Sequence, residues 1–95
     1  MTDEFTLREA RELLSAARDM APDGLAAPFT QEDMATALAA GAEVKSIDEG
    51  LLDFPTYIEG QAAYWCWRAG EEDIRWWHPR DTGFAGRRAI EDGHR

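Results

Sequence analysis

Few side chains in this 95-residue chain titrate near neutral pH or act as soft metal ligands, and most of them lie between residues 50 and 87. This stretch holds the single cysteine, Cys66, one of the two histidines, His78, and all four tryptophans. Histidine serves as a general base or a metal ligand because its ordinary pKa is close to neutrality. His78 is therefore the main catalytic candidate, and Asp81 is predicted to orient its ring. The alternative is a hydrogen-bonded structural histidine at the end of a strand.

A metal site has less support in the sequence. The second histidine, His94, lies near the C-terminus, and His78 combined with carboxylates of Asp53, Glu71 or Asp81 gives no diagnostic ligand spacing. No P-loop, dinucleotide-binding glycine pattern, GxSxG elbow or CxxC motif is present. We therefore predict no metal ligands, and the sequence identifies no cofactor.

The segment after His78, HPRDTGFAGRR, combines arginines with glycines that allow close backbone approach. Such a segment can bind a carboxylate or a phosphate. The alternative is an ordered loop whose arginines pair with nearby carboxylates. An exposed aromatic surface beside an arginine is also expected on the preceding strands. The predicted ligand-binding residues are Tyr64, Arg75, Trp77, Arg80, Gly83, Gly86 and Arg87.

Two aromatic-rich segments, residues 62–68 and 73–78, favour a β-hairpin that turns at residues 69–72. A two- or four-residue loop pairs Trp65 with Trp76 and Tyr64 with Trp77. Alternation then predicts a core face made of Ala63, Trp65, Trp67, Ile74, Trp76 and His78, and a partly wet face made of Tyr64, Cys66, Arg68, Asp73, Arg75 and Trp77. Cys66 and His78 lie on opposite faces in this register, which argues against a cysteine–histidine pair or a shared metal.

The elements before the hairpin are two helices and two extended segments. Apolar residues recur at helical spacing over residues 7–21, and Thr6 with Glu9 forms a capping box. Thr30 is predicted to cap a second helix that ends near Gly41. Residues 42–47 alternate as in a strand, and Pro55 predicts that residues 51–55 form an edge strand or extended loop.

The predicted fold class is α+β, with a short antiparallel helix pair (6–40) packed on a small antiparallel sheet that contains the aromatic hairpin (42–88). One domain spans residues 1–95 and ends in a flexible tail (89–95). The net charge of -9 disfavours nucleic acid and anionic membranes as partners. A single cysteine, together with a start that has no signal-peptide pattern and no apolar run of membrane-spanning length, predicts a cytoplasmic protein.

Several motifs occur in a characteristic order: FTLREARELL, GAEVKSIDEGLLDFP, YWCWRAGE, IRWWH and GFAGR. In this the chain resembles a family of small bacterial proteins of unknown function, over residues 5–20 and 41–88. The resemblance implies an opening helix and a small sheet, although residues 21–40 replace a longer helical arm. It implies no established activity. It also implies a shared motif made of Asp53, Cys66, Trp67, Gly70, Glu71, His78, Gly83, Phe84, Gly86 and Arg87.

Two functional hypotheses follow. The first is a non-catalytic module that binds a partner protein or a small anion, as a homodimer, through the Tyr64, Arg75 and Trp77 face and the 79–88 loop. The second is a small enzyme in which His78 is a general base or metal ligand, assisted by Asp81 or Glu71, with an arginine-lined anion site. The sequence does not separate an accessory subunit of a larger complex from the first hypothesis.

Overall fold

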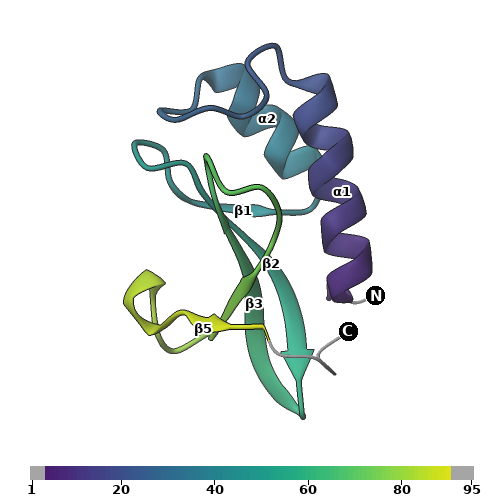
Figure 1. The fold of residues 1–95 in the computed structure, drawn as a ribbon, viewed down its shortest axis with the longest axis vertical. Coiled ribbons are helices and arrows are strands. Elements are labelled where there is room, and N and C mark those ends of the chain that lie inside the picture. Colours follow the sequence, from purple (N-terminus) through teal and green to yellow (C-terminus); the bar gives the residue numbers. More distant parts are fainter. Residues whose placement is uncertain (1–3, 91–95) are drawn as a thin grey trace.

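The computed structural model describes residues 4–90, apart from the side chain of Phe84. Two helices, α1 (Leu7–Met20) and α2 (Gln31–Ala39), precede a five-stranded antiparallel sheet (Figure 1). The strands follow one another in sequence order as β1 (Glu43–Ser46), β2 (Leu51–Ile58), β3 (Gln61–Arg68), β4 (Trp76–Pro79) and β5 (Arg88–Ala89), with a short 3-10 helix, η1 (Phe84–Gly86), before β5. The predicted α+β fold class is confirmed.

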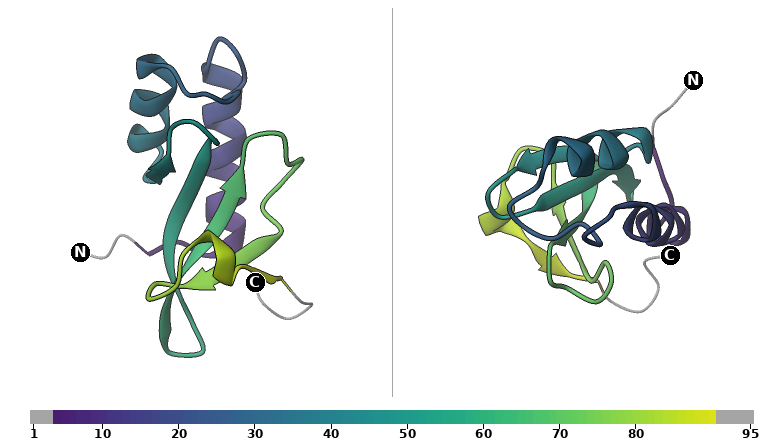
Figure 2. Two further views of the ribbon diagram at one scale, coloured as in Figure 1. Left: turned by 90° about the vertical axis from the view of Figure 1, so that its left-hand side faces the viewer. Right: turned by 90° about the horizontal axis from the view of Figure 1, so that it is seen from above.

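Both helices begin where the sequence predicts. The Thr6 hydroxyl accepts a hydrogen bond from the Glu9 amide at 3.1 Å, and the Glu9 carboxylate accepts one from the Thr6 amide at 2.8 Å. Thr30 and Asp33 form the same reciprocal cap on α2. The chain then turns so that α2 runs back beside α1 (Figures 1 and 2). Each cap satisfies backbone donors that a helix N-terminus otherwise leaves unpaired.

One face of the sheet, which we call the inner face, packs on α1. Large apolar residues from three neighbouring strands alternate onto this face, where they meet the buried stripe of the helix. Trp65 also donates its indole N–H to the Phe5 carbonyl oxygen at 2.8 Å, which ties β3 to the start of the chain. The inner-face residues of β2, β3 and β4 are Leu52, Phe54, Ala63, Trp65, Trp67 and Trp77.

The prediction that residues 51–55 form an edge strand or loop is wrong in part. β2 is an interior strand, paired with β3 along its whole length and with β1 at residues 51–53. Beyond Asp53, however, β1 no longer pairs with β2, and this edge of β2 is left open. The Pro55 carbonyl oxygen points to that outer edge, where it accepts a hydrogen bond from the Phe5 amide at 2.8 Å. Because the nitrogen of a strand residue lies on the same edge as its oxygen, the missing N–H of Pro55 costs the β2–β3 ladder nothing.

The predicted register between β3 and β4 is wrong by one residue. The structure pairs Trp65 with Trp77 and Cys66 with Trp76, and seven residues, 69–75, connect the two strands in place of a tight turn. A one-residue shift moves every side chain of β4 to the other face. Trp77 is therefore in the core, and His78 lies on the same face as Cys66.

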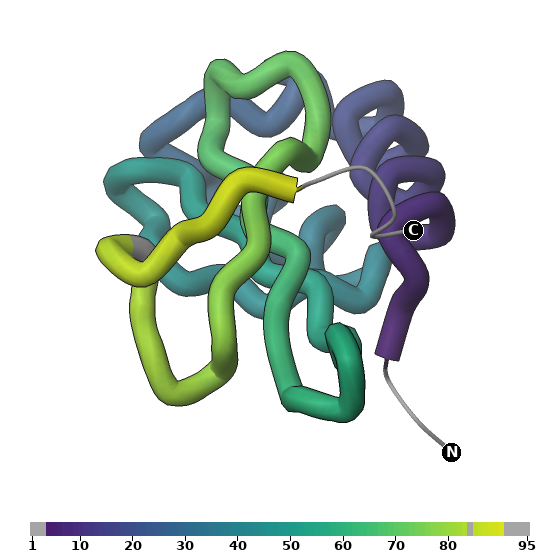
Figure 3. The backbone as a smooth tube through the Cα atoms, turned by 60° about the horizontal axis from the view of Figure 1, so that its bottom comes forward, coloured from purple at the N-terminus to yellow at the C-terminus, as the bar shows by residue number. Residues whose placement is uncertain are grey.

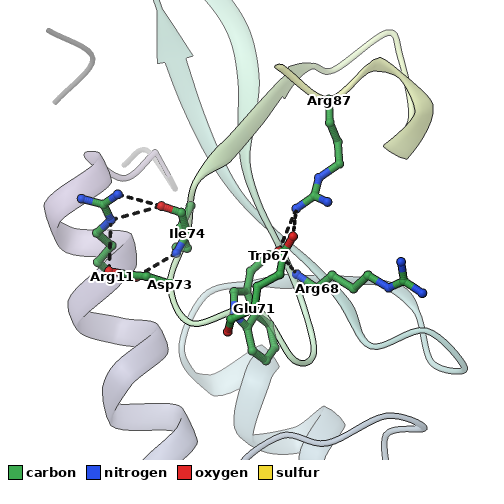
Figure 4. Close-up of polar contacts among 7 residues, drawn as sticks. All are labelled: Arg11, Trp67, Arg68, Glu71, Asp73, Ile74 and Arg87. Atoms are coloured by element: carbon green, nitrogen blue, oxygen red, sulfur yellow. Dashed lines mark hydrogen bonds and ion pairs between the residues drawn. The ribbon is translucent and has the colours of Figure 1, made fainter. Parts of the chain in front are cut away.

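The connection between β3 and β4 is held from both sides, and this fixes the register (Figure 4). Arg11 of α1 donates two hydrogen bonds to the Ile74 carbonyl oxygen, at 2.7 and 3.2 Å, and Ile74 is fully buried. On the other side, the Glu71 carboxylate accepts hydrogen bonds from the Arg68 amide at 2.7 Å and from Arg87 at 2.8 and 2.9 Å. Residues 73–75 thus anchor the loop, and only residues 76–79 pair with β3.

The predicted flexible tail starts too early. Arg88–Ala89 forms β5, and the Ile90 amide donates to the Arg75 carbonyl oxygen at 3.0 Å. The rest of that tail, residues 91–95 including His94, lies outside the described residues. Among the residues that are described, neither helix combines the length and apolar composition needed to cross a membrane.

Candidate functional site

Three buried polar side chains meet on the outer face of the sheet, the face opposite the inner face. Asp53 of β2, Cys66 of β3 and His78 of β4 are 2%, 1% and 3% exposed. Cross-strand pairing places Asp53 directly beside Cys66, and the observed β3–β4 register brings in His78. A carboxylate oxygen, the Sγ atom and a ring nitrogen all lie within 4.8 Å of one another. We refer to these residues as the Asp53–Cys66–His78 cluster.

The ring of His78 is fixed by two hydrogen bonds. Its Nδ1 lies 2.8 Å from the Pro79 carbonyl oxygen, and its Nε2 lies 2.9 Å from Asp53 Oδ2. Because a carbonyl oxygen only accepts, Nδ1 carries a hydrogen. Nε2 and Asp53 therefore share one further proton, which belongs either to the ring or to the carboxyl group. The other oxygen of Asp53, Oδ1, is buried without a hydrogen-bond partner among residues 4–90.

Burial dominates the proton affinities in the cluster. It raises the pKa of the Asp53 carboxyl, with opposing effects from His78 and the Cys66 thiol. Burial and the neighbouring Asp53 charge raise the pKa of Cys66 to about 12. The sulfur is therefore a thiol at neutral pH, which makes it a poor nucleophile. A cysteine–histidine–aspartate triad is also excluded by geometry, since both nitrogens of His78 are engaged with Pro79 and Asp53 and neither is left to activate the thiol.

A cavity of about 270 Å³ opens onto the cluster. We call it the outer cavity. Its walls come from β1, from the start of β2 and from the loop after β4, which runs on the side of the strands away from α1 (Figures 1 to 3). Besides the cluster, its lining residues are Lys45, Leu51, Tyr64, Arg80, Thr82 and Gly83.

Three of the predicted ligand-binding residues line this cavity: Tyr64, Arg80 and Gly83. Tyr64 donates its hydroxyl to Glu43 at 3.0 Å, and its ring centre lies 5.4 Å from that of His78. Arg80 donates to the carbonyl oxygens of Ala63 and Thr56, both at 3.1 Å. The structure therefore places these three residues beside the cluster, although ligand binding by them stays a prediction.

The remaining predicted site residues do not line the outer cavity. Asp81 is exposed, and Asp53, not the predicted Asp81, is hydrogen-bonded to the His78 ring. Trp77 is buried in the core, so the predicted exposed face of Tyr64, Arg75 and Trp77 does not form. Arg75 is exposed and pairs with Glu72 at 3.5 Å.

Gly86 and Arg87 have packing partners of their own. A Cβ atom on Gly86 would collide with the Thr82 side chain, so glycine is needed for the 3-10 turn. Arg87 contacts Glu71 (Figure 4). It also stacks over Trp76, 5.0 Å from the ring centre. These contacts match the alternative interpretation of the segment, an ordered loop whose arginines pair with carboxylates.

The sequence analysis considered Asp53 as a carboxylate beside His78 but set it aside for lack of diagnostic spacing, it excluded Cys66, and it missed Lys45. The prediction that Cys66 and His78 lie on opposite faces is wrong because the connection between the strands has an odd number of residues, whereas only even loops were considered. The motif that the family resemblance implies includes Asp53, Cys66 and His78, and this was the one signal in the sequence that grouped the three residues.

Comparison with known proteins places the chain in a family. The model of a family of uncharacterized conserved proteins, DUF2203, matches residues 26–90. The chain belongs to this family. The region shared with DUF2203 contains α2, the whole sheet and the Asp53–Cys66–His78 cluster, while α1 precedes it. No curated protein and no solved structure gives a significant match.

Proposed function

We propose that this DUF2203 protein binds one transition-metal ion, of the zinc type, through Asp53, Cys66 and His78. The observation that carries the proposal is the burial of a carboxylate, a thiol and an imidazole within 4.8 Å of one another. Zinc in proteins prefers sulfur, nitrogen and carboxylate ligands, and around a tetrahedral ion these atoms are about 3.3–3.8 Å apart. Small side-chain shifts therefore suffice to close the cluster on a metal.

The hydrogen bond of His78 supports a ligand role. Metal-binding histidines usually donate their second ring N–H to a carboxylate or a backbone carbonyl, which orients the ring and selects the coordinating nitrogen. Here Nδ1 donates to Pro79, and Nε2 is directed at the cluster. The buried Oδ1 of Asp53 adds an acceptor without a partner within the described chain, which is costly unless something binds it.

Three protein ligands leave a fourth position of a tetrahedral ion for water or another molecule, as in catalytic zinc sites. The outer cavity opens onto the cluster and would supply room at this position. The proposal thus develops the second sequence-based hypothesis, in which His78 is a metal ligand, with Asp53 and Cys66 in place of Asp81 and Glu71. A metal-free acid–base pair is the second candidate, favoured by the 2.9 Å contact between Asp53 and His78.

Zinc affinity, measured by competition with a chromophoric chelator, tests the proposal. Wild-type protein should bind one ion per chain, and Asp53→Asn or Cys66→Ala should weaken binding by about 100-fold or more, since even outer contacts of such sites are worth 10–100-fold. Asp81→Asn is the matched control, because it removes an exposed carboxylate close to His78 in sequence and should leave zinc affinity unchanged. Equal affinity in all four proteins would favour the metal-free pair.

A further inference from the structure

We propose that the outer cavity binds a small carboxylate whose oxygen occupies the fourth position of the metal and whose charge is balanced by Lys45 and Arg80. This rests on the proposed metal site. Its own support is the charge and shape of the cavity walls. Apart from the cluster, the charged side chains that line the cavity within residues 4–90 are both cations.

Lys45 is the only lysine of the chain. Its ammonium group lies 2.8 Å from Glu43 and 4.6 Å from the centre of the Tyr64 ring, with a side chain that is 39% exposed. The hydrogen bond to Glu43 raises the pKa of Lys45, so the group stays charged at neutral pH. A lysine held in its protonated form is a binding charge and not a nucleophile.

Arg80, whose Cζ lies 5.2 Å from the centre of the Tyr64 ring, is held in place by several contacts. Its Nε and Nη2 atoms donate to backbone carbonyl oxygens, and Nη2 lies 3.6 Å from Glu4. No hydrogen bond of its Nη1 group is found within the described part of the chain. A guanidinium oriented in this way, with donors to spare, is suited to a carboxylate oxygen.

Charge and size favour a monoanion. A divalent metal with ionised Asp53 and Cys66 is neutral, and Glu43 and Glu4 partly offset Lys45 and Arg80, so little positive charge remains for a dianion such as phosphate. The cavity, at about 270 Å³, is just below the range of roughly 300–1,000 Å³ that holds drug-sized ligands. Leu51 and the Tyr64 ring supply apolar wall for a short aliphatic chain.

The experiment uses the full chain loaded with Co²⁺ in place of zinc, because visible absorption of Co²⁺ reports changes in its ligands. Propionate should change the spectrum saturably. Lys45→Gln should keep the affinity for Co²⁺ but lower the affinity for propionate by roughly five- to tenfold, as expected for loss of one partly exposed cation near an anion. Arg8→Gln, which removes the same charge from an exposed position on α1, should match wild type.

The outcomes separate the two proposals. Absence of a Co²⁺ spectrum that depends on Cys66 would overturn the metal site and the carboxylate site together. A Cys66-dependent spectrum that propionate does not change, or a Lys45→Gln protein that binds propionate as well as wild type, would overturn the carboxylate site alone. So would tighter binding of inorganic phosphate than of propionate, or equal binding of propionate to metal-free protein measured by tryptophan fluorescence.

Discussion

The inner and outer faces of the same three strands differ sharply in chemistry. Each strand contributes two sequence neighbours, one to each face, in the pairs Phe54 and Asp53, Trp65 and Cys66, and Trp77 and His78. All six side chains are buried. The first member of each pair fills the core against α1, whereas the second joins a cluster of polar groups on the far side. Burial alone therefore does not explain the outer face.

The inner face stabilises the fold, whereas the residues of the outer face are of types that bind ligands. An apolar core gains stability from every side chain that it buries. Buried ionisable groups cost stability unless they are fully paired, and apolar residues of similar volume are often more stable in their place. Asp53 nevertheless keeps one buried oxygen without a partner in the described residues. A buried group of carboxylate, thiol and imidazole side chains that costs stability and lies beside a cavity is typical of a binding site.

The largest effect is expected on the inner face. Phe54→Ala should lower the free energy of unfolding by about 3–5 kcal/mol, because it leaves a cavity in the packed core. Urea denaturation followed by tryptophan fluorescence measures this. Tyr57→Ala, on the same strand but 55% exposed, is the control and should cost about 1 kcal/mol or less. A loss for Phe54→Ala as small as that of the control would show that the inner face is not the core.

The second effect is the pH dependence of zinc binding. Since burial raises the pKa of Cys66 to about 12, the metal-free thiol is protonated between pH 6 and 8, and zinc must displace that proton. Zinc affinity should therefore rise by about tenfold or more per pH unit, which corresponds to about 1.4 kcal/mol. In Cys66→Ala, the slope of the logarithm of zinc affinity against pH should be lower by one, because one proton fewer is displaced. A slope that is the same in both proteins would remove Cys66 from the ligand set.

The third prediction sets stability against binding. Asp53→Asn should stabilise the metal-free protein by about 1 kcal/mol while it abolishes tight zinc binding, because it removes a buried charge but keeps a hydrogen bond to His78. The raised pKa of Asp53 means that the folded state favours the protonated carboxyl. The protonated carboxyl therefore contributes stability that is complete below the pKa of Asp53 in the unfolded chain. This contribution is lost as pH rises through the pKa of Asp53 in the folded protein.

Denaturation of both metal-free proteins over a pH series checks this sign. The advantage of Asp53→Asn over wild type should grow as pH rises. An advantage that shrinks with pH, or a large loss of stability in the variant, would mean that the Asp53 carboxylate stabilises the fold and that the outer face resembles an ordinary structural ion pair.

The fourth prediction concerns the connection that sets the register. Glu71→Gln should cost about 1–2 kcal/mol, because the carboxylate accepts charge-assisted hydrogen bonds from Arg87 in a partly buried position (Figure 4). Glu72→Gln is the neighbouring control. The Glu72 side chain is 90% exposed in its pair with Arg75, so the loss of stability should stay within about 0.5 kcal/mol. Equal effects at the two positions would mean that Glu71 does not anchor the loop.

Local signals in the sequence predicted much of the fold. Both helix caps depend on residues three apart, and the inner-face tryptophans of β3 follow from alternation within one strand. Such features need no knowledge of distant contacts. The predicted order of elements therefore agrees with the structure, whereas the prediction of an edge strand failed at residues 51–53, because it depends on how far β1 extends.

The candidate site could not be predicted in the same way because it depends on register. Whether His78 joins Cys66 or faces the core is decided by the number of residues in the connection, and that number is set by contacts of residues 71–74 with α1 and with Arg87. These contacts are remote in sequence. The three residue types can be read from the sequence, but only the contacts of residues 71–74 with α1 and Arg87 bring Asp53, Cys66 and His78 together.

The most direct test of the central claim is an anomalous difference map from a crystal grown with zinc and measured on either side of the zinc absorption edge. One strong peak per chain is expected, about 2.3 Å from Cys66 Sγ and about 2.0–2.2 Å from His78 Nε2 and a carboxylate oxygen of Asp53. A map with no peak at the cluster, while Asp53 and His78 keep their direct hydrogen bond, would contradict it.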